Sequence, residues 1–212
     1  MTAEALASLE LPASMLESRL MRRGGVMAVR GLIAPDLLEA LRLDFHEQLP
    51  NARRCVHAGQ NEADWRGGEP ARALSSVPCG PLQWTVFGSA AMGGAISELC
   101  GLDLEATGAG TYSHYSEPGD FLALHRDIVR CDIAVITCLE EHGEPTARLR
   151  AYPQCAAEPL TAVYRHGPRG GVDVVLAPGD TAVMAGGLVP HEVTPLGAGQ
   201  RRAVTITCFR LR

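Results

Sequence analysis

Aromatic residues, long apolar runs and an excess of basic charge are all scarce in this chain. Aromatics make up 5% of the 212 residues while the hydrophobic fraction is 46%, so the core must consist mostly of Leu, Val, Ile and Ala. That hydrophobic content excludes a disordered chain, and the length suits one domain with a sizeable core. A net charge of −5, with no basic face interleaved with aromatics, argues against a nucleic-acid partner.

Membrane and export signals are absent as well. The longest apolar stretches are too short to span a bilayer, so we expect no membrane partner. Residues 1–20 lack the basic start and continuous apolar core of a signal peptide, which predicts a cytoplasmic protein. The seven cysteines are irregularly spaced and include no CxxC pair, so we expect free thiols. The oligomeric state is left open by the sequence.

The first half of the chain predicts helices and loops around one strand or two. The predicted elements are a helix over 3–22, a strand over 25–33, a helix from Ala34-Pro35-Asp36 to about Gln48, a candidate strand over Gln83–Phe87 and a short helix over Ser89–Cys100 that Gly101 ends. Residues 50–80 are polar and rich in Gly, Pro and Arg. Such a segment predicts a long loop, and long loops are often functional lids.

From about residue 107 the chain changes to short β-type runs separated by Gly, Pro and Asp. The predicted strands are Ala109–Tyr115, Phe121–His125, Cys131–Leu139, Ala147–Tyr152, Val172–Leu176, Thr181–Ala185 and Arg202–Arg210. A series of strands without helices between them predicts an antiparallel sandwich or small barrel. We therefore expect a single domain over 1–212, in which a helical and loop region over 1–106 supports a β-rich catalytic core over 107–212.

Three side chains in the β-rich half could hold a metal ion. His125-Arg126-Asp127 ends one predicted strand, and His191 follows much later, after Pro190. Alternate side chains of a strand share a face, so His125 and Asp127 point the same way, and a later His can complete a triangle. Two imidazoles and one carboxylate leave open positions on the metal, as non-haem Fe(II) needs for a cosubstrate and O₂. A closed structural zinc site would need four ligands, usually with thiolates.

An arginine after the second His meets a further need of such a site. A dicarboxylate that chelates iron at one end leaves its far carboxylate buried, and a guanidinium can hold it as a bidentate pair. Gly199-Gln200-Arg201 leads into the last strand, where Arg201, Ala203, Thr205 and Thr207 share one face. Small residues beside Arg201 leave room for a ligand. Each feature alone has an ordinary structural explanation, but they occur together and in order.

Together these motifs resemble the prolyl-4-hydroxylase-like branch of the Fe(II)/2-oxoglutarate oxygenases. The branch has Tyr, Gly, HxD, PGD, His and Gly-x-Arg in this order. The matching residues are Tyr115, Gly119, His125, Asp127, Pro178-Gly179-Asp180, His191 and Gly199-Gln200-Arg201. The likeness covers roughly residues 108–210. It implies a mainly β fold with N-terminal helices, namely a double-stranded β-helix of the jelly-roll or cupin type.

The resemblance also implies a cofactor set and site residues. His125, Asp127 and His191 would bind Fe(II) and form the catalytic centre. Arg201 would bind the far carboxylate of 2-oxoglutarate, and Tyr115 and Thr205 would assist. O₂ is the other cosubstrate, and ascorbate is a candidate further cofactor.

The implied activity is that of a dioxygenase, an oxidoreductase that oxidises a small molecule such as an amino acid or a natural-product intermediate. Related halogenases have a small residue in place of the carboxylate, so Asp127 favours hydroxylation, desaturation or cyclisation. Arg66 and Arg126 are candidates to hold a substrate carboxylate at the mouth of the site.

There are four alternatives to this function. A hydroxylase of protein or peptide side chains would share the triad. A nucleic-acid demethylase of the AlkB type would need a second arginine six residues after the first, where Thr207 and Cys208 stand. A metal-dependent cupin of another chemistry would typically show HxH followed by Glu. A binding module without activity would have no stoichiometric Fe(II) site.

Overall fold

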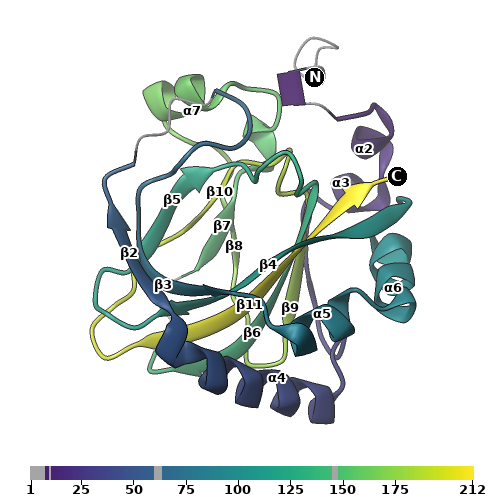
Figure 1. Cartoon of the computed structure of the whole chain (residues 1–212). Helices are drawn as coiled ribbons and strands as arrows, with labels where there is room; N and C mark the ends of the chain where they lie inside the picture. Colours follow the sequence, from purple (N-terminus) through teal and green to yellow (C-terminus); the bar gives the residue numbers. More distant parts are fainter. Residues whose placement is uncertain (1–7, 10, 60–63, 145–147) are drawn as a thin grey trace.

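The computed structural model describes residues 8–9, 11–59, 64–144 and 148–212 (Figure 1). The helices are α2 (Ser14–Glu17), α3 (Arg19–Arg22), α4 (Pro35–Gln48), α5 (Pro81–Phe87), α6 (Ala90–Cys100) and α7 (Leu160–His166). The strands are β1 (Val26–Val29), β2 (Arg53–His57), β3 (Arg72–Pro78), β4 (Leu104–Tyr115), β5 (Phe121–His125), β6 (Ile133–His142), β7 (Leu149–Ala151), β8 (Val172–Val174), β9 (Thr181–Met184), β10 (His191–Val193) and β11 (Arg201–Leu211). Short 3-10 turns lie at Leu49–Asn51 and Pro153–Cys155.

The strands form one antiparallel sheet that curls around a central core (Figure 1). Its order is β1-β9-β6-β11-β4-β3-β5-β10-β7-β8, and β2 pairs with β3 off this path. Because β3 pairs with both β4 and β5, it joins the layer that contains β11 to the layer that contains β10. This nearly closed arrangement confirms the predicted double-stranded β-helix with its helices on the outside.

Helix α4 covers the outer face of the layer that contains β4, β11 and β6 (Figure 1). Its buried side chains include Phe45, whose ring lies 5.8 Å from that of Tyr112 and 5.7 Å from that of His114. Since alternate residues of β4 face opposite sides, Tyr115 lies on the inner side of the barrel. Both faces of this layer are therefore buried, one by helices and one by the barrel interior.

The turn between β4 and β5 is fixed by Asp120. Its carboxylate accepts hydrogen bonds from the backbone N–H groups of Ser116 and Glu117 and pairs with Arg54 at 2.6 Å. Burial alone would raise the pKa of Asp120, but Arg54 and the two N–H groups hold it below its ordinary value. The Asp120 carbonyl also accepts from Leu196 N–H, so the turn anchors β5 against the segment before β11.

The N-terminal segment is less helical than predicted. The single helix expected over 3–22 is wrong in its described part, where α2 and α3 are separate. Ser18 divides them: its backbone is extended, with ψ of 154°, and its side chain accepts a hydrogen bond from Met21 N–H to cap α3. Residues 3–7 and 10 of the predicted helix lie outside the described residues.

Residues 50–80 contain two strands, so the prediction of one long loop is wrong. β2 and β3 pair from Arg53 opposite Ser76 to His57 opposite Arg72. The described residues of this range without helix or strand include 58–59, 64–71 and 79–80. Residues 60–63 lie outside the described part. The region 1–106 therefore supplies β1, β2 and β3 to the sheet, beyond the helices and loops predicted for it.

Other predicted elements differ in outcome. The candidate strand Gln83–Phe87 is wrong, because Gly80 and Pro81 start α5 there, and proline at a first helical position loses no hydrogen bond. The helix between Ser89 and Gly101 is confirmed as α6, with a side-chain cap at Ser89 and a left-handed Gly101. Helix α7 interrupts the strand series, which was predicted without helices. The predicted strand Ala147–Tyr152 corresponds to β7, and its first residue lies outside the described part.

The cysteines also depart from the prediction. Cys131 and Cys208 form a disulfide, so free thiols are wrong for this pair. The other cysteines, all free, are Cys55, Cys79, Cys100, Cys138 and Cys155. None of the helices in the described part of the chain is long and apolar enough to cross a membrane.

Candidate metal centre and its two cavities

Neighbouring strands bring the three predicted ligands together. His125 ends β5, and His191 begins β10 directly opposite it in register. Cross-strand partners point to the same face of a sheet, so both rings face the barrel interior. Asp127 follows β5, and its Oδ1 lies 3.8 Å from Nε2 of each histidine. All three ligand atoms lie within 4.8 Å of one another, a spacing that suits a metal ion.

The two histidines have a fixed orientation. Nδ1 of His125 lies 2.9 Å from the Ala123 carbonyl, and Nδ1 of His191 lies 2.9 Å from the Val189 carbonyl. A carbonyl oxygen only accepts, so each Nδ1 must carry the hydrogen, and each Nε2 keeps its lone pair. This is the usual support of a metal-binding histidine.

Burial keeps the imidazoles neutral. Burial, together with the neighbouring His191, lowers the pKa of His125 to about 3. Burial likewise lowers the pKa of His191 to about 4. The pKa of Asp127 is raised by burial, against the opposing effect of His125 and Arg66. Neutral imidazoles are the form that binds a metal, so the two histidines need no deprotonation at neutral pH.

The surroundings of Asp127 fit a bound cation. Its Oδ2 is buried and has no hydrogen-bond partner among the described residues. A Cβ added at Gly186 would lie 1.8 Å from this oxygen, so the glycine provides the room that the carboxylate occupies. A buried carboxylate oxygen without a partner is costly. A metal ion would satisfy it, and the donor set of two imidazoles and one carboxylate suits Fe(II).

One cavity extends from the triad into the barrel. This inner cavity, of about 70 Å³, is lined by Tyr115, Leu122, His125, Asp127, Ala134, Ile136, Leu149, Leu176, His191, Val193, Arg202, Val204 and Ile206. Most of its lining is apolar, and its cation is Arg202, which is 4% exposed. The Nε of Arg202 donates to Glu141, while Nη2 is buried with no partner among the described residues. Tyr115 is opposite Arg202 in register, so the two enter the cavity together.

The cavity corrects the prediction for Arg201 and Thr205. Arg201 is exposed and lies on the outer face, and the side chains of β11 that line the cavity belong to Arg202, Val204 and Ile206. Thr205 is fully buried on the helix side, where Gln83 of α5 donates to its hydroxyl. The inward face of β11 is therefore the opposite of the predicted one. Tyr115 lines the cavity, and its contact with 2-oxoglutarate stays a prediction.

A second cavity reaches the triad from outside. This outer cavity, of about 280 Å³, is lined by Gly67, Gly68, Pro70, Arg72, Ala109, Gly110, Thr111, Leu122, His125, Arg126, Asp127, Ile128, Cys131, Ile206 and Cys208. It shares His125 and Asp127 with the inner cavity. A bulge in β5 contributes, because three steps from Leu122 to His125 oppose two steps from Val193 to His191. A bulge re-aims side chains, so Leu122 and His125 both face the cavities.

Neither predicted substrate arginine is available at the mouth. Arg126 is 1% exposed, and its guanidinium donates to five backbone carbonyls, those of Leu188, Trp65, Cys155, Ala156 and Glu158. The side chain of Arg66 is 2% exposed and pairs with Asp132 at 2.9 Å. It also donates to the Ile128 carbonyl at 2.7 Å, behind Asp127. Both arginines hold the segments around Asp127 in place. The arginine that lines the outer cavity without such partners is Arg72, which lies in the range 50–80 that was predicted as a loop.

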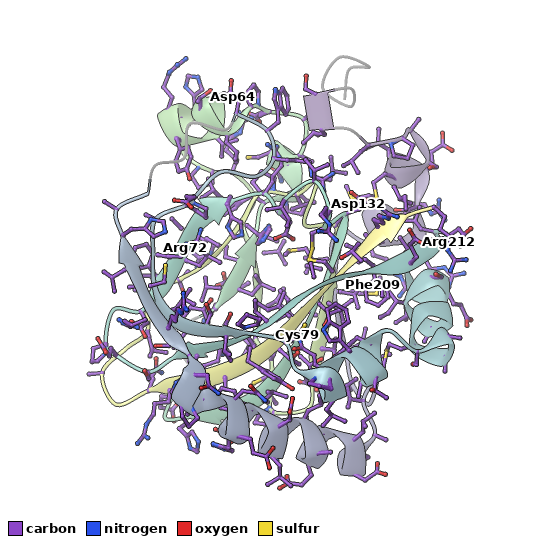
Figure 2. All side chains as sticks on the ribbon, in the orientation of Figure 1. Asp64, Arg72, Cys79, Asp132, Phe209 and Arg212 are labelled. Carbon is purple, nitrogen blue, oxygen red and sulfur yellow. A yellow bond between two sulfur atoms is a disulfide. The ribbon has the colours of Figure 1, made fainter. Side chains whose placement is uncertain are left out.

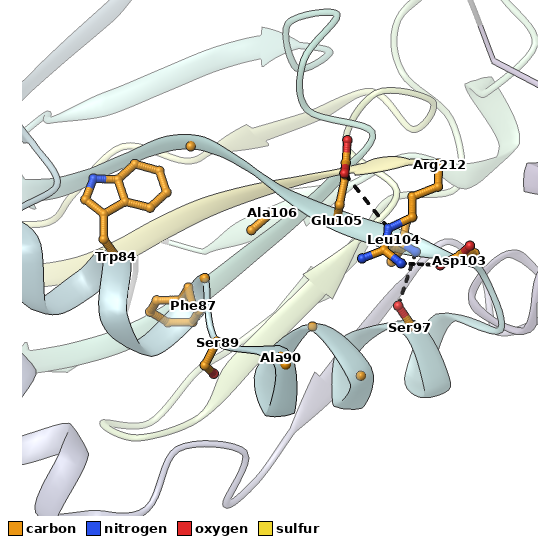
Figure 3. A pocket seen from close by; sticks show the side chains of 14 residues that line it. Trp84, Phe87, Ser89, Ala90, Ser97, Asp103, Leu104, Glu105, Ala106 and Arg212 are labelled. Carbon is orange, nitrogen blue, oxygen red and sulfur yellow. Dashed lines mark hydrogen bonds and ion pairs between the residues drawn. The ribbon is translucent and has the colours of Figure 1, made fainter.

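A more voluminous cavity than these two lies away from the triad. It measures about 650 Å³ and lies between α5, α6 and β4, with Trp84 and Phe87 on one side (Figure 3). Its polar groups pair with each other: Arg212 meets Asp103 at 3.5 Å and Glu105 at 3.9 Å. Ser97 accepts a hydrogen bond from Leu104 N–H. No metal-ligand cluster of the described residues lies there, so the chemistry points to the triad.

Comparison with known proteins places this fold. No family model matches the sequence, and no curated protein matches it. The structure is similar to a prolyl-4-hydroxylase from Pseudomonas putida, with a TM-score of 0.62 and 20% identity, over 98% of this chain and 99% of that one. It is similar to the non-haem α-ketoglutarate-dependent epimerase SnoN from nogalamycin biosynthesis, with a TM-score of 0.70 and 15% identity, over 96% and 80% of the two chains.

A third similar structure is HygX from Streptomyces hygroscopicus, solved with nickel and 2-oxoglutarate bound. Its TM-score is 0.63 and its identity 11%, over 94% of this chain and 87% of that one. At such identities the likeness establishes the fold. The resemblance to 2-oxoglutarate oxygenases that the motifs indicate is confirmed to that extent.

Proposed function

We propose that this chain is an Fe(II)- and 2-oxoglutarate-dependent dioxygenase that oxidises a small molecule, with hydroxylation as the reaction. The observation that carries the proposal is the position of the triad where two cavities meet. The inner one ends at a buried arginine with an unpartnered nitrogen, and the outer one opens to solvent. Such a site has separate places for a cosubstrate and a substrate, both in reach of one metal ion.

Three protein groups would hold the iron. His125 and His191 would each offer Nε2, and Asp127 would offer its carboxylate. Three protein ligands leave open positions for a chelating cosubstrate and O₂. When bound, Fe(II) with 2-oxoglutarate supplies the oxidation of a C–H bond by O₂, while the protein positions the reactants and excludes water.

Arg202 is the proposed partner of the far carboxylate of 2-oxoglutarate. Glu141 holds its Nε and so orients the guanidinium, which leaves Nη2 directed at a ligand. A charge-assisted hydrogen bond would satisfy this buried group. Tyr115, beside it, is the proposed second contact, and burial raises the pKa of its hydroxyl, so the hydroxyl stays a donor. The apolar remainder of the inner cavity suits the methylene groups of a compact dicarboxylate.

The outer cavity suits a small substrate. Its volume of about 280 Å³ is near the lower end of ordinary ligand pockets. The similar structures include an epimerase and a carbocyclase, SnoN and SnoK, so related folds direct oxidation to different products. Hydroxylation is the proposal for this chain, and the retained carboxylate of Asp127 supports it over halogenation.

The test is an anaerobic titration. Fe(II) is added first, then 2-oxoglutarate, and the visible charge-transfer band of the chelate is recorded. Wild type should develop the band. Arg202→Met should need about 10- to 100-fold more 2-oxoglutarate, the loss expected for one or two hydrogen bonds to a charged group. Arg201→Met, which removes the exposed neighbouring charge, is the matched control and should behave as wild type. Bound iron without any band in wild type would contradict the proposal.

A further inference from the structure

The charged side chains of the outer cavity are few. They are Arg72, Arg126, His125 and Asp127. The last two are the proposed metal ligands. The guanidinium of Arg126 donates hydrogen bonds to backbone carbonyls, at 2.7 Å to those of Leu188 and Glu158. Arg72 is the side chain that neither the metal site nor the fold explains.

The guanidinium of Arg72 has few hydrogen-bond partners. Its Nε donates to the Pro70 carbonyl at 3.2 Å, and within the described ranges its Nη1 and Nη2 have no partner. Two other strand arginines, by contrast, have carboxylate partners: Arg54 pairs with Asp120 at 2.6 Å, and Arg150 with Asp173 at 2.5 Å. A half-buried guanidinium without a carboxylate, on the wall of a cavity that leads to a metal centre, is placed to meet an anion from outside.

The position of Arg72 fits such a contact. It begins β3 and pairs in register with Leu122 of β5, the strand that ends in His125. Figure 2 shows Arg72 on the side of the barrel where β3 and β5 run. Leu122 lines both cavities, so a molecule bound at Arg72 would pass along Leu122 and Ile206 to reach the triad. The lining of the outer cavity therefore contains both an available cation and two of the proposed metal ligands.

We infer that the substrate is a small molecule with one carboxylate, which Arg72 binds at the wall of the outer cavity while its reacting carbon lies at the triad. This inference rests on the proposed function. One guanidinium offers two parallel N–H groups that match a carboxylate. A phosphate dianion would keep an uncompensated charge, because Arg72 is the free cation of the described lining. Ala109, Ile206 and the Cys131–Cys208 disulfide give the remaining lining apolar surface, which suits a hydrocarbon skeleton.

The probes for the test are matched pairs, each a small carboxylic acid and the primary amide of the same skeleton. Aliphatic, aromatic and N-acetylated amino-acid skeletons are included. The protein is loaded with Ni(II) and 2-oxoglutarate, so that no turnover occurs, and binding is measured by titration calorimetry or ligand-observed NMR. Wild type should bind acids about 10- to 100-fold more tightly than their amides, since a hydrogen-bonded charge pair is at stake.

Two variants locate the preference. Arg72→Met keeps the aliphatic stem and should bind acids and amides alike. Arg53→Met is the control, since Arg53 is an exposed arginine on the neighbouring strand β2, and it should keep the preference for acids. The melting temperature of each variant checks that it is folded. Arg72→Gln serves as the second variant if Arg72→Met is destabilised.

Several results would overturn the inference. They are equal binding of acids and amides by wild type, an acid preference that survives in both Arg72 variants, and no binding of any pair at millimolar concentration. A higher 2-oxoglutarate requirement in Arg72→Met would also overturn it, by assigning Arg72 to the cosubstrate. Failure of wild type to bind Ni(II) and 2-oxoglutarate is recorded before any acid is added. That result counts against the proposed function itself.

Discussion

The contact between Gly186 and Asp127 allows the metal site to be disabled without changing a ligand. A Cβ at position 186 would lie 1.8 Å from Asp127 Oδ2 and 2.9 Å from its Cγ, whereas real Cβ contacts stay above 3.0 Å. The oxygen must therefore move by about 1.2 Å, the difference between 3.0 Å and 1.8 Å. The backbone cannot follow easily, because Asp127 N–H donates to the Gly186 carbonyl at 2.9 Å.

That displacement far exceeds what a metal site tolerates. Ligand distances vary by only about 0.2 Å in working sites. Changes that merely disturb the orientation of a ligand cost roughly 10- to 100-fold in metal affinity. Gly186→Ala should therefore lower Fe(II) affinity by about 100-fold or more, or about 2.8 kcal/mol. Backbone strain does not contribute, since the φ of Gly186 lies outside the left-handed region.

The assay is anaerobic titration of the metal-free protein with Fe(II), followed by calorimetry. Asp127→Ala gives the loss for a missing ligand, and Gly186→Ala should approach it. The double variant should be no worse than Asp127→Ala alone, because both changes act on one group. Gly93→Ala in α6 is the control, since a Cβ there meets nothing within 4 Å, and its affinity should equal that of wild type. Wild-type affinity in Gly186→Ala would refute the reasoning.

Further predictions concern stability. Saturating Ni(II) should raise the melting temperature of wild type by roughly 5–10 °C and leave Asp127→Ala unchanged, because the metal binds the folded state alone; an equal rise in both would contradict the assigned ligand. Asp120→Asn should lower the free energy of unfolding in urea by about 1–3 kcal/mol at pH 7. The pKa of Asp120 is held down in the folded state, so its contribution is present above about pH 4 and is lost as pH falls through that pKa. The gap between the two proteins should close in acid, and a constant gap would count against the charge. Reduction of the Cys131–Cys208 disulfide should cost about 2–4 kcal/mol in the same assay. Alkylation of the denatured, unreduced protein should label five thiols, and seven labelled thiols would disprove the bond.

The strands and helices that the sequence predicted well are those with strong local signals. Helix α4 begins at Pro35 and ends at Gln48 as predicted, and β5 has the predicted bounds Phe121–His125. The sequence did not predict β2 and β3, because their side chains are a mixture of polar and apolar types. They form strands by pairing with each other and, for β3, with β4. Such pairing is tertiary and leaves little periodicity in the sequence.

The site was predictable where spacing determines it. An HxD motif at the end of a strand and a later His reach one point because β5 and β10 are neighbours. The choice between Arg201 and Arg202 was not determined in this way. Both faces of β11 are buried, one against α5 and one in the barrel, so a run of alternating small and apolar residues does not reveal which face is inward. Arg72 was missed because its strand was predicted as a loop.

The disulfide illustrates a different limit. Cys131 and Cys208 are 77 residues apart, and their pairing depends on β6 lying beside β11. Cysteine spacing along the chain carries no trace of that neighbourhood. The bond lies in the wall of the outer cavity. The presence of sulfur atoms beside the metal site was therefore not predictable from the cysteine spacing either.

The residue between two of the proposed ligands ties the metal site to two segments that are far apart in the sequence. Arg126 donates to the Trp65 carbonyl in one segment and to the carbonyls of Cys155 and Glu158 in the other. Leu160 N–H donates to the Asp64 carbonyl and joins the two segments directly. Three parts of the chain thus share one guanidinium, and we expect a change that displaces either segment to displace the HxD motif as well.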